Sequence, residues 1–343
     1  MDIDRLGGQP PSAPLMLMQR IPAGAKSYAI DRLAHKMWIG LAATATAATA
    51  LSACHIALVG LTLLNGAALF VSAVALLSLL SVQYADSLIP HLPEKWQHLA
   101  HHLQAVINES FTLIPIVCLY FFNAVSEKPS NHPPILCVHG YLHRSSAWFY
   151  LKACLEEEGL GQMYSLNLPT PFNSIEMYSI MVENKIKEIK QKTGAKEVTL
   201  VLHSMGGVVG SHLATTCGED LGVKKIVTLA SPLLGTRLAV FGVGECAKQM
   251  RHGPENAFIN GIHERIGTTE HVRFLHIGTE HDAVIIPHES TIPYHGQGKK
   301  HIETRVVKGL GHLSVLYSPR ITQWVVEFIM RKDKGVGAGD AVV

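Results

Sequence analysis

The segment LHSMGG, residues 202–207, is the part of the sequence best suited to chemistry. An apolar run, VTLVL, leads into it, and a run compatible with a helix, VVGSHLATT, follows. A serine on a sharp turn between a buried strand and a helix points its hydroxyl out of the sheet's carboxyl edge, so Ser204 is a candidate nucleophile. Gly206 and Gly207 supply the small residues that such a tight turn needs. The positive end of the following helix favours developing negative charge, and the backbone N–H of Met205 is a candidate oxyanion donor.

This segment resembles the nucleophile elbow of bacterial lipases and esterases of the α/β-hydrolase superfamily, which often reads GHSMGG. The resemblance covers residues 134–331. It implies an α/β-hydrolase fold: a mostly parallel sheet, helices on both faces and a cap insertion over the nucleophile. The sequence has Leu202 where the family has its first glycine, and this side chain must find room against a neighbouring strand or helix.

A second motif, VHGYLHRSSAW at 138–148, ends a short apolar run with His-Gly. In the family, the loop after such a strand gives the second oxyanion N–H, so the resemblance implies that Tyr141 provides it here. Gly140 would let the backbone approach the substrate closely. Arg144 and Trp148 are candidates for lining the acyl or head-group site.

The other two members of a triad are implied by the same resemblance. The family keeps its acid in a loop after a late strand, and Asp282 in GTEHDAVIIP fits that position, with Glu280 as its rival. The family's histidine follows a glycine-rich loop near the end of the domain, and His312 in KGLGHLSVLYSP fits it. The order Ser204, Asp282, His312 matches that of α/β hydrolases. The histidine would take the serine proton, and the acid would hold the imidazole in the correct tautomer.

From about residue 130, short apolar runs alternate with amphipathic ones. Such alternation indicates a parallel sheet covered by helices on both faces. We therefore predict a catalytic domain over 131–333, with a cap at about 232–270. The expected strands include 135–138, 198–202, 225–230, 272–277 and 303–309, and the expected helices include 174–193 and 317–331.

Composition and charge exclude other classes of protein. Lys plus Arg number 29 and Asp plus Glu 27, giving a formal charge of +2, whereas nucleic-acid-binding proteins normally show a dense basic patch. The six cysteines lack CxxC spacing, and we expect buried, reduced thiols, with one disulfide as the alternative. Four histidines before the catalytic domain are irregularly spaced, and no carboxylate or cysteine completes a metal site with them. We expect neither a metal nor a cofactor. These histidines are His91, His98, His101 and His102.

Residues 37–85 contain no Asp, Glu, Lys or Arg. One transmembrane helix needs about 20 residues, so this run suffices for two. Asn65-Gly66 is a typical turn pair near its middle, and we predict a helical membrane hairpin. A buried helix pair in a soluble protein and a single tilted span are the alternatives. Basic residues in the polar tail 1–36 predict a cytoplasmic N-terminus, and a hairpin would return the catalytic domain to the cytoplasmic side of the membrane.

Two further segments flank the catalytic domain. The linker 86–130 is predicted to contain interfacial helices, with Trp96 at the membrane boundary. Its apolar stretch 111–125 is short for a span and is interrupted by Pro115, so we expect an interfacial element or a helix packed on the catalytic domain. The tail 334–343, rich in Gly and Ala, is predicted to be loose.

These features lead to three hypotheses of function. The first is a membrane-anchored serine hydrolase that cleaves carboxylic esters, with lipid esters as the expected class. The second is an acyltransferase or thioesterase, because the same acyl-enzyme can pass to an alcohol or release a thiol. The third is a non-catalytic membrane interaction protein on a hydrolase scaffold. The expected partners are an ester or lipid substrate and a membrane, and the sequence identifies no protein partner.

Overall fold

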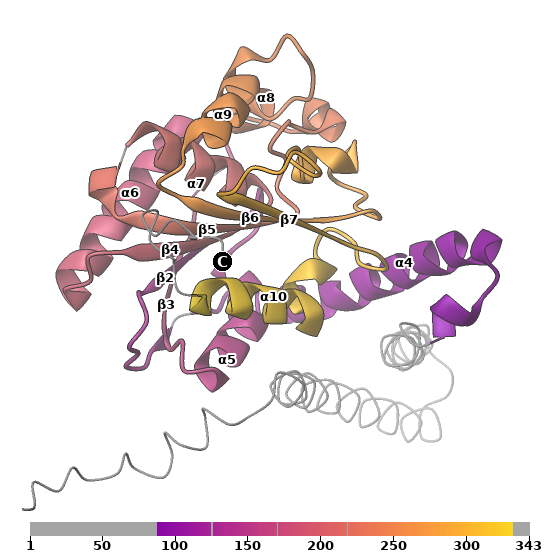
Figure 1. Ribbon diagram of the computed structural model, residues 1–343, viewed down its shortest axis with the longest axis horizontal. Coiled ribbons are helices and arrows are strands. Elements are labelled where there is room, and N and C mark those ends of the chain that lie inside the picture. The colour runs from indigo at the N-terminus through magenta and orange to yellow at the C-terminus, as the bar shows by residue number, and fades with distance from the viewer. Residues whose placement is uncertain (1–87, 125, 170, 218, 332–343) are drawn as a thin grey trace, which may run out of the picture.

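The described part of the protein is built around one central β-sheet. The structure, a computed structural model, describes residues 88–124, 126–169, 171–217 and 219–331. The strand order is β1-β3-β2-β4-β5-β6-β7, with β1 antiparallel to β3 and the other neighbouring pairs parallel (Figure 1). This confirms the mostly parallel sheet predicted from the apolar runs. The strands are β1 (Ser126–Glu127), β2 (Ile135–Val138), β3 (Gln162–Leu166), β4 (Val198–His203), β5 (Val223–Leu229), β6 (Arg273–Thr279) and β7 (Ile302–Val307).

Helices cover both faces of this sheet. Helices α6, α7 and α9 pack on one face, and α5 and α10 pack on the other (Figure 1). The longer helices are α4 (Glu94–Cys118), α5 (Phe149–Glu157), α6 (Ile175–Thr193), α7 (Met205–Thr216), α9 (Ala257–Thr268) and α10 (Pro319–Met330). The connections contain α8 (Glu245–Gln249) and the 3-10 turns η1 (Ile89–His91), η2 (Ser145–Trp148), η3 (Glu219–Leu221), η4 (Arg237–Phe241), η5 (His288–Thr291) and η6 (Ser314–Tyr317).

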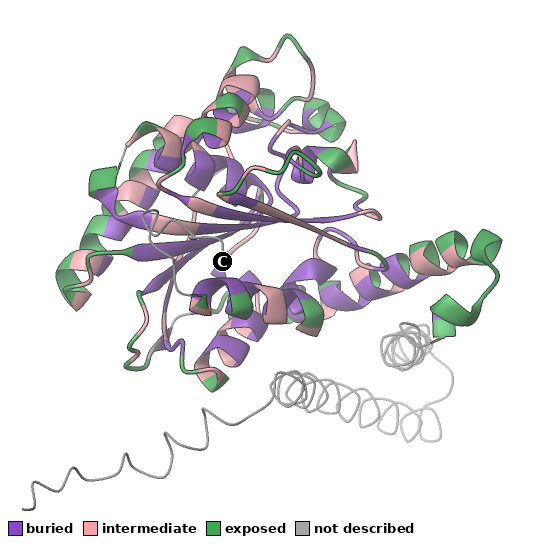
Figure 2. Cartoon of the chain, in the orientation of Figure 1, coloured by how far each residue is buried: buried purple, intermediate pink, exposed green. Residues whose placement is uncertain are grey.

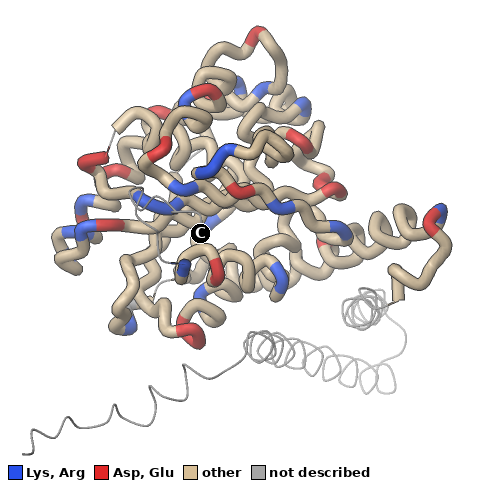
Figure 3. Tube along the Cα trace, in the orientation of Figure 1, with Lys and Arg blue, Asp and Glu red and all other residues tan. Residues whose placement is uncertain are grey.

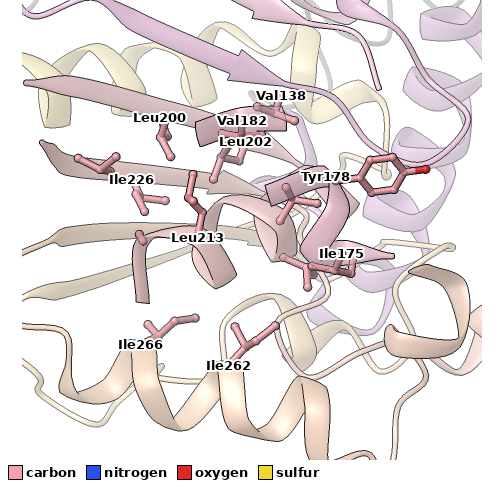
Figure 4. Packing of buried hydrophobic residues seen from close by; sticks show 14 of the residues in the cluster. Val138, Ile175, Tyr178, Val182, Leu200, Leu202, Leu213, Ile226, Ile262 and Ile266 are labelled. Carbon is pink, nitrogen blue, oxygen red and sulfur yellow. The ribbon is translucent and has the colours of Figure 1, made fainter. Parts of the chain in front are cut away.

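Side chains of the central strands alternate between the two helical layers. In β4, Leu200 and Leu202 belong to the core that contains α6 and α7, whereas Val201 belongs to the core that contains α5 and α10. Every residue of this strand is buried, as expected where both faces of a parallel sheet are covered (Figure 2). Figure 4 shows Leu200 and Leu202 on the side of the sheet that carries Leu213 of α7. Two cores therefore hold the strand ends in place.

The chain reverses its direction across the sheet after β3. It passes from β2 to β3 through α5, and then back past β2 to β4 through α6. Strands β2 and β4 are paired neighbours, with Val138 opposite Leu202. The loops that follow these two strands therefore leave the sheet side by side. Open α/β sheets bind their ligands in the crevice at such a switch point.

Helix α4 joins two parts of the linker that the sequence suggested were separate. It continues through Pro115 as one helix of 25 residues. Phe111 and Ile116 are buried against the catalytic domain, whereas Trp96 and Val117 are exposed. The apolar stretch after residue 110 is therefore mostly a helix that packs on the domain. Figure 1 shows the N-terminal part of α4 projecting away from the sheet.

Only part of the segment predicted as a cap, 232–270, lies outside the helical layers that cover the sheet. Helix α9 presents Ile259, Ile262 and Ile266 to the core beside α7, because this spacing places all three on one helix face. It is thus the helix that connects β5 to β6 and covers the sheet, which corrects the C-terminal boundary of the predicted cap. The part before α9 contains η4 and α8.

Several sequence predictions concern segments outside the described residues: the tail 1–36, the membrane hairpin 37–85 and the tail 334–343. Among helices in the described ranges, none combines the length and apolar character needed to cross a bilayer.

Positions of both charge signs are interspersed along the described chain (Figure 3). The described cysteines are free thiols: Cys118, Cys137, Cys154, Cys217 and Cys246.

Candidate active site

Ser204 occupies a sharp turn between β4 and α7. Its φ of +53° and ψ of −126° lie outside the regions that residues other than glycine usually adopt. Such a strained strand-to-helix turn lifts the serine hydroxyl above the carboxyl edge of the sheet. The turn fits because Gly206 has no side chain, since a Cβ there would collide with the carbonyl oxygen of Val138. Ser204 is 7% exposed, so most of its surface is shielded from water.

The Ser204 hydroxyl lies beside His312, which follows β7. Nε2 of His312 is 3.0 Å from Oγ of Ser204, and Nδ1 is 2.9 Å from Oδ2 of Asp282. A carboxylate accepts only from a protonated nitrogen, so Nδ1 carries the proton and Nε2 accepts from the serine hydroxyl. The structure thus brings the three predicted triad residues together in hydrogen-bonding order.

Asp282 is held by the backbone of its own loop. Its Oδ1 accepts from two backbone N–H groups at 2.8 Å each, which leaves Oδ2 for the histidine. The rival acid, Glu280, instead forms an ion pair with Lys308 at 3.4 Å. The contacts of these two side chains therefore assign the triad carboxylate to Asp282.

The charges around His312 suit it to act as a base. Burial alone would lower the pKa of His312, because a low-dielectric interior disfavours charge. The charge and hydrogen bond of Asp282 nevertheless raise that pKa above its ordinary value, and the charge of Glu109 adds to the effect. A raised pKa increases the tendency of the imidazole to take a proton from Ser204.

Met205 and Tyr141 are the residues whose backbone N–H groups the sequence predicts as oxyanion donors. Met205 is the first residue of α7, so its N–H has no acceptor within the helix. Tyr141 follows Gly140 in the loop after β2. A Cβ at Gly140 would lie 2.7 Å from the Cβ of Ser204. This close approach requires glycine, and it brings the backbone of Tyr141 next to the nucleophile.

His139 fixes the conformation of this oxyanion loop. Its Nε2 accepts from the Leu168 N–H at 3.0 Å, so Nδ1 carries the proton and donates to the Gly140 carbonyl oxygen at 2.8 Å. Burial lowers the pKa of His139 to about 4, so the ring is neutral at pH 7. The loop is also tied to the segment before α8, because the Tyr141 hydroxyl donates to the Val243 carbonyl oxygen at 3.0 Å.

A cavity of about 250 Å³ opens beside the nucleophile. Gly140 and Arg144, both predicted to bind substrate, line it, as does Met205. Trp148 does not, because its side chain is fully buried in the core that contains α5 and α10. The predicted contact between Trp148 and substrate is therefore corrected. The other lining residues are Tyr120, His139, Leu142, His143, Asn167, Leu168, Pro169 and Pro171.

The histidines of α4 gather around one ring. His98, His101 and His102 place their ring centroids 5.7, 6.1 and 5.9 Å from that of His281. Burial is the main cause that lowers the pKa of His281 to about 4, and the neighbouring histidines add to it. Within the described part of the chain, no group of His, Cys, Asp or Glu is arranged to hold a metal ion.

Two residues without a predicted role contact the loop of His312. His203 donates from Nε2 to the His312 carbonyl oxygen at 2.9 Å. Glu109 of α4 accepts from the backbone N–H groups of Leu313 at 2.8 Å and Ser314 at 2.9 Å. His203 directly precedes Ser204 in the sequence, and this position could have marked it as part of the site. Glu109 lies 204 residues before Leu313, so only the folded chain reveals its contact.

Comparison with protein families matches one part of the chain. Residues 173–329, which are 157 of the 343, match the family model described as the PGAP1-like alpha/beta domain. This range contains Ser204, Asp282 and His312. No curated protein matches the sequence.

Solved structures similar to this chain have low sequence identity to it. A gene product from Listeria innocua is 14% identical, with a TM-score of 0.47 and coverage of 60% of this chain and 96% of that chain. The mature lipase BlEst2 from Bacillus licheniformis is 18% identical, with a TM-score of 0.46 and coverage of 59% and 94%. Lipase B from Aspergillus fumigatus is 16% identical, with a TM-score of 0.49 and coverage of 62% and 54%.

The family match and the triad concern the same strands. Ser204 follows β4, Asp282 follows β6 and His312 follows β7, which is the order of nucleophile, acid and histidine in α/β hydrolases. The sheet that carries them is mostly parallel and covered on both faces. The described domain therefore has the fold of α/β hydrolases, and residues 173–329 within it match the PGAP1-like alpha/beta domain.

Proposed function

We propose that this protein is a serine hydrolase that cleaves carboxylic esters. The observation that carries the proposal is the series of hydrogen bonds from Ser204 through His312 to Asp282. A fold alone does not imply an activity, but a serine beside an oriented base is the arrangement that activates a hydroxyl for attack on an acyl carbon. The strained turn at Ser204 supports the same chemistry.

In this proposal the reaction passes through an acyl-enzyme. Oγ of Ser204 attacks the ester carbonyl carbon while its proton passes to Nε2 of His312. The N–H groups of Met205 and Tyr141 bind the oxyanion, usually the largest single contribution to the rate. His312 then protonates the departing alcohol. Finally it takes a proton from water, whose oxygen attacks the acyl carbon, and passes that proton to Oγ of Ser204 as the acyl–oxygen bond breaks and the acid leaves.

A lipid ester at a membrane is the proposed substrate class. Exposed apolar side chains stand at the cavity: Leu142 lines it and is 65% exposed, and Phe172, next to the lining residue Pro171, is 66% exposed. The charge-free run 37–85 supports a membrane-anchored enzyme with its catalytic domain on the cytoplasmic side. Both features suit a substrate whose acyl chain starts in a bilayer.

Product analysis with the full-length protein in detergent micelles tests the proposed reaction. Wild type and Ser204→Ala are given 4-nitrophenyl esters of increasing acyl chain length, with and without an added alcohol. Free acid that is formed by the wild type and not by Ser204→Ala supports hydrolysis. Acyl transfer to the alcohol in place of acid release would favour the acyltransferase alternative. No turnover of any ester would contradict the proposal.

Alkaline carbonate extraction tests the membrane association. We expect the full-length protein to stay in the membrane fraction, and its release would contradict the anchor. A reporter fused after Val343 tests the orientation. Reporter activity only outside the cytoplasm would indicate a single span and place the catalytic domain on the opposite side.

A further inference from the structure

The cavity beside Ser204 contains an unbalanced positive charge. None of the described residues that line it is Asp or Glu. The Arg144 guanidinium lies over the ring of Tyr120, 5.6 Å from its centroid, and no described acidic side chain pairs with it. Arginine carries a positive charge in proteins and has no acceptor atom of its own.

Two buried side-chain nitrogens belong to residues in the same wall. Nε of Arg144 and Nε2 of His143 are buried and lack a partner among the described residues. Nδ1 of His143 lies 2.8 Å from the Arg144 backbone nitrogen and 3.0 Å from the Arg144 carbonyl oxygen, so it contacts both backbone groups of the next residue. Buried polar atoms without partners cost free energy, and a ligand that accepts from the Arg144 guanidinium would offset part of that cost.

We infer that this cavity binds an anionic group of the ester substrate, a phosphate or a carboxylate. The inference rests on the proposed function, because Gly140 and Met205 belong both to the cavity and to the predicted oxyanion site. An ester whose carbonyl carbon lies at Ser204 would have its polar head group within reach of the cavity. The planar donors of arginine match the oxygens of phosphate and carboxylate.

Matched esters test this inference. Monoacyl esters of glycerol, glycerol 3-phosphate and glycerate carry the acyl chain that the product analysis shows to be hydrolysed fastest. They differ only in the charged group. We expect wild type to show a higher kcat/KM on one of the charged esters than on the glycerol ester. Arg144→Gln should lower that preference by about 10- to 100-fold, and Arg144→Lys should lower it less.

Lys300→Gln is the matched control. It removes one positive charge just before the amino end of β7, whereas the triad lies at the carboxyl ends of the strands. It should leave the preference unchanged. Equal rates on all three esters, or a preference unaffected by Arg144→Gln, would contradict the anionic site while leaving the proposed hydrolase intact. The charged ester with the higher kcat/KM relative to the glycerol ester shows whether the site prefers a phosphate or a carboxylate. Failure to hydrolyse any ester would contradict the proposed function itself.

A second inference rests on separate contacts, those between α4 and the loop that carries the catalytic histidine. Nδ2 of Asn108 donates to the Gly309 carbonyl oxygen at 2.7 Å. Gln104 occupies the space that a side chain at Gly309 would need. A Cβ at Gly311 would lie 2.6 Å from Oε2 of Glu109. The two glycines before the histidine are thus explained by the docking of α4.

Glu109 binds the backbone immediately after His312. Its carboxylate accepts from the next two N–H groups along the chain, at 2.8 and 2.9 Å. His203 holds the His312 carbonyl oxygen from the other side. We propose that Glu109 is a positioning residue that keeps Nε2 of His312 within reach of Ser204. Helix α4, which lies outside the family match, is then part of the catalytic apparatus.

Glu109→Gln tests this role, with Glu94→Gln at the exposed start of the same helix as the control. We expect Glu109→Gln to lower kcat about tenfold or more with little change in KM, because positioning of a base acts on the chemical step. Four titratable groups interact with His312 or lie beside it, and the Glu109→Gln substitution removes the charge of one of them. The others are Asp282, His143 and His203.

The pH profile separates positioning from a merely structural role. The negative charge of Glu109 favours protonated His312, so its loss should move the acidic limb of kcat/KM to lower pH. Gly311→Ala, which would displace the Glu109 carboxylate, should lower kcat in the same way and keeps the test decisive if Glu109→Gln fails to fold. Full activity and an unmoved acidic limb in a folded variant would contradict the role of Glu109.

Discussion

The side chain of Leu202 fills the space that a side chain at Gly210 would occupy. Position 202 is where related elbows have glycine, and here the small residue lies instead on α7, eight residues later. Leu202 is fully buried and belongs to the core between β4 and α7. The Leu202 side chain is therefore accommodated by the glycine at position 210 of the facing helix.

A double-mutant cycle tests this exchange. Leu202→Gly should destabilise the protein by about 2–5 kcal/mol, because it leaves a cavity in a close-packed core. Gly210→Ala should cost about 1–3 kcal/mol through overpacking, and this cost should shrink when Leu202 is also glycine. Thermal unfolding in micelles measures all four proteins. Strict additivity of the two changes would contradict the contact.

The two acids of the loop after β6 should differ sharply in their effect on the rate. Asp282→Asn replaces the acceptor of the Nδ1–H with an amide that favours the wrong tautomer, and we expect kcat to fall by about 10⁴. Glu280→Gln breaks only a partly exposed ion pair with Lys308, so kcat should change little. Steady-state kinetics on a neutral ester compares them. Equal losses, or the reverse order, would give the triad role to Glu280.

The pH dependence of kcat/KM should reflect the raised pKa of His312. The base works only when Nε2 is unprotonated, so the rate falls as the pH drops through this pKa. Because Asp282 and Glu109 raise the pKa, the acidic limb should lie above about 6.5, the ordinary value for histidine. Kinetics between about pH 5 and 9 with an uncharged ester measures the limb. A limb below the ordinary value would be inconsistent with this electrostatic environment.

Local sequence patterns predicted the central strands because those strands are buried on both faces. β2 and β4 are continuous apolar runs that end next to residues suited to chemistry. β3 was missed because its sequence, QMYSL, mixes polar and apolar residues and is only partly buried near the edge of the sheet. Its period fits neither an amphipathic strand nor a fully buried one.

The site could be predicted where the chemistry follows directly from a strand end, as it does at Ser204. The choice of Asp282 over Glu280 required the folded loop, because two acids two residues apart are equivalent in the sequence until their partners are known. Trp148 was misassigned because an aromatic residue near an oxyanion loop can face either the ligand or the core. The contact of Glu109 joins distant segments, and no local pattern contains such information.

Labelling of the nucleophile tests the central claim most directly. The full-length protein is treated with a fluorophosphonate, and the modified residue is identified by mass spectrometry of its peptides. We predict one adduct, on Ser204, that is absent from Ser204→Ala and strongly slowed in His312→Ala, because the serine needs its base to attack phosphorus. An adduct on another residue, or labelling that persists in folded Ser204→Ala, would contradict the assignment of Ser204 as nucleophile.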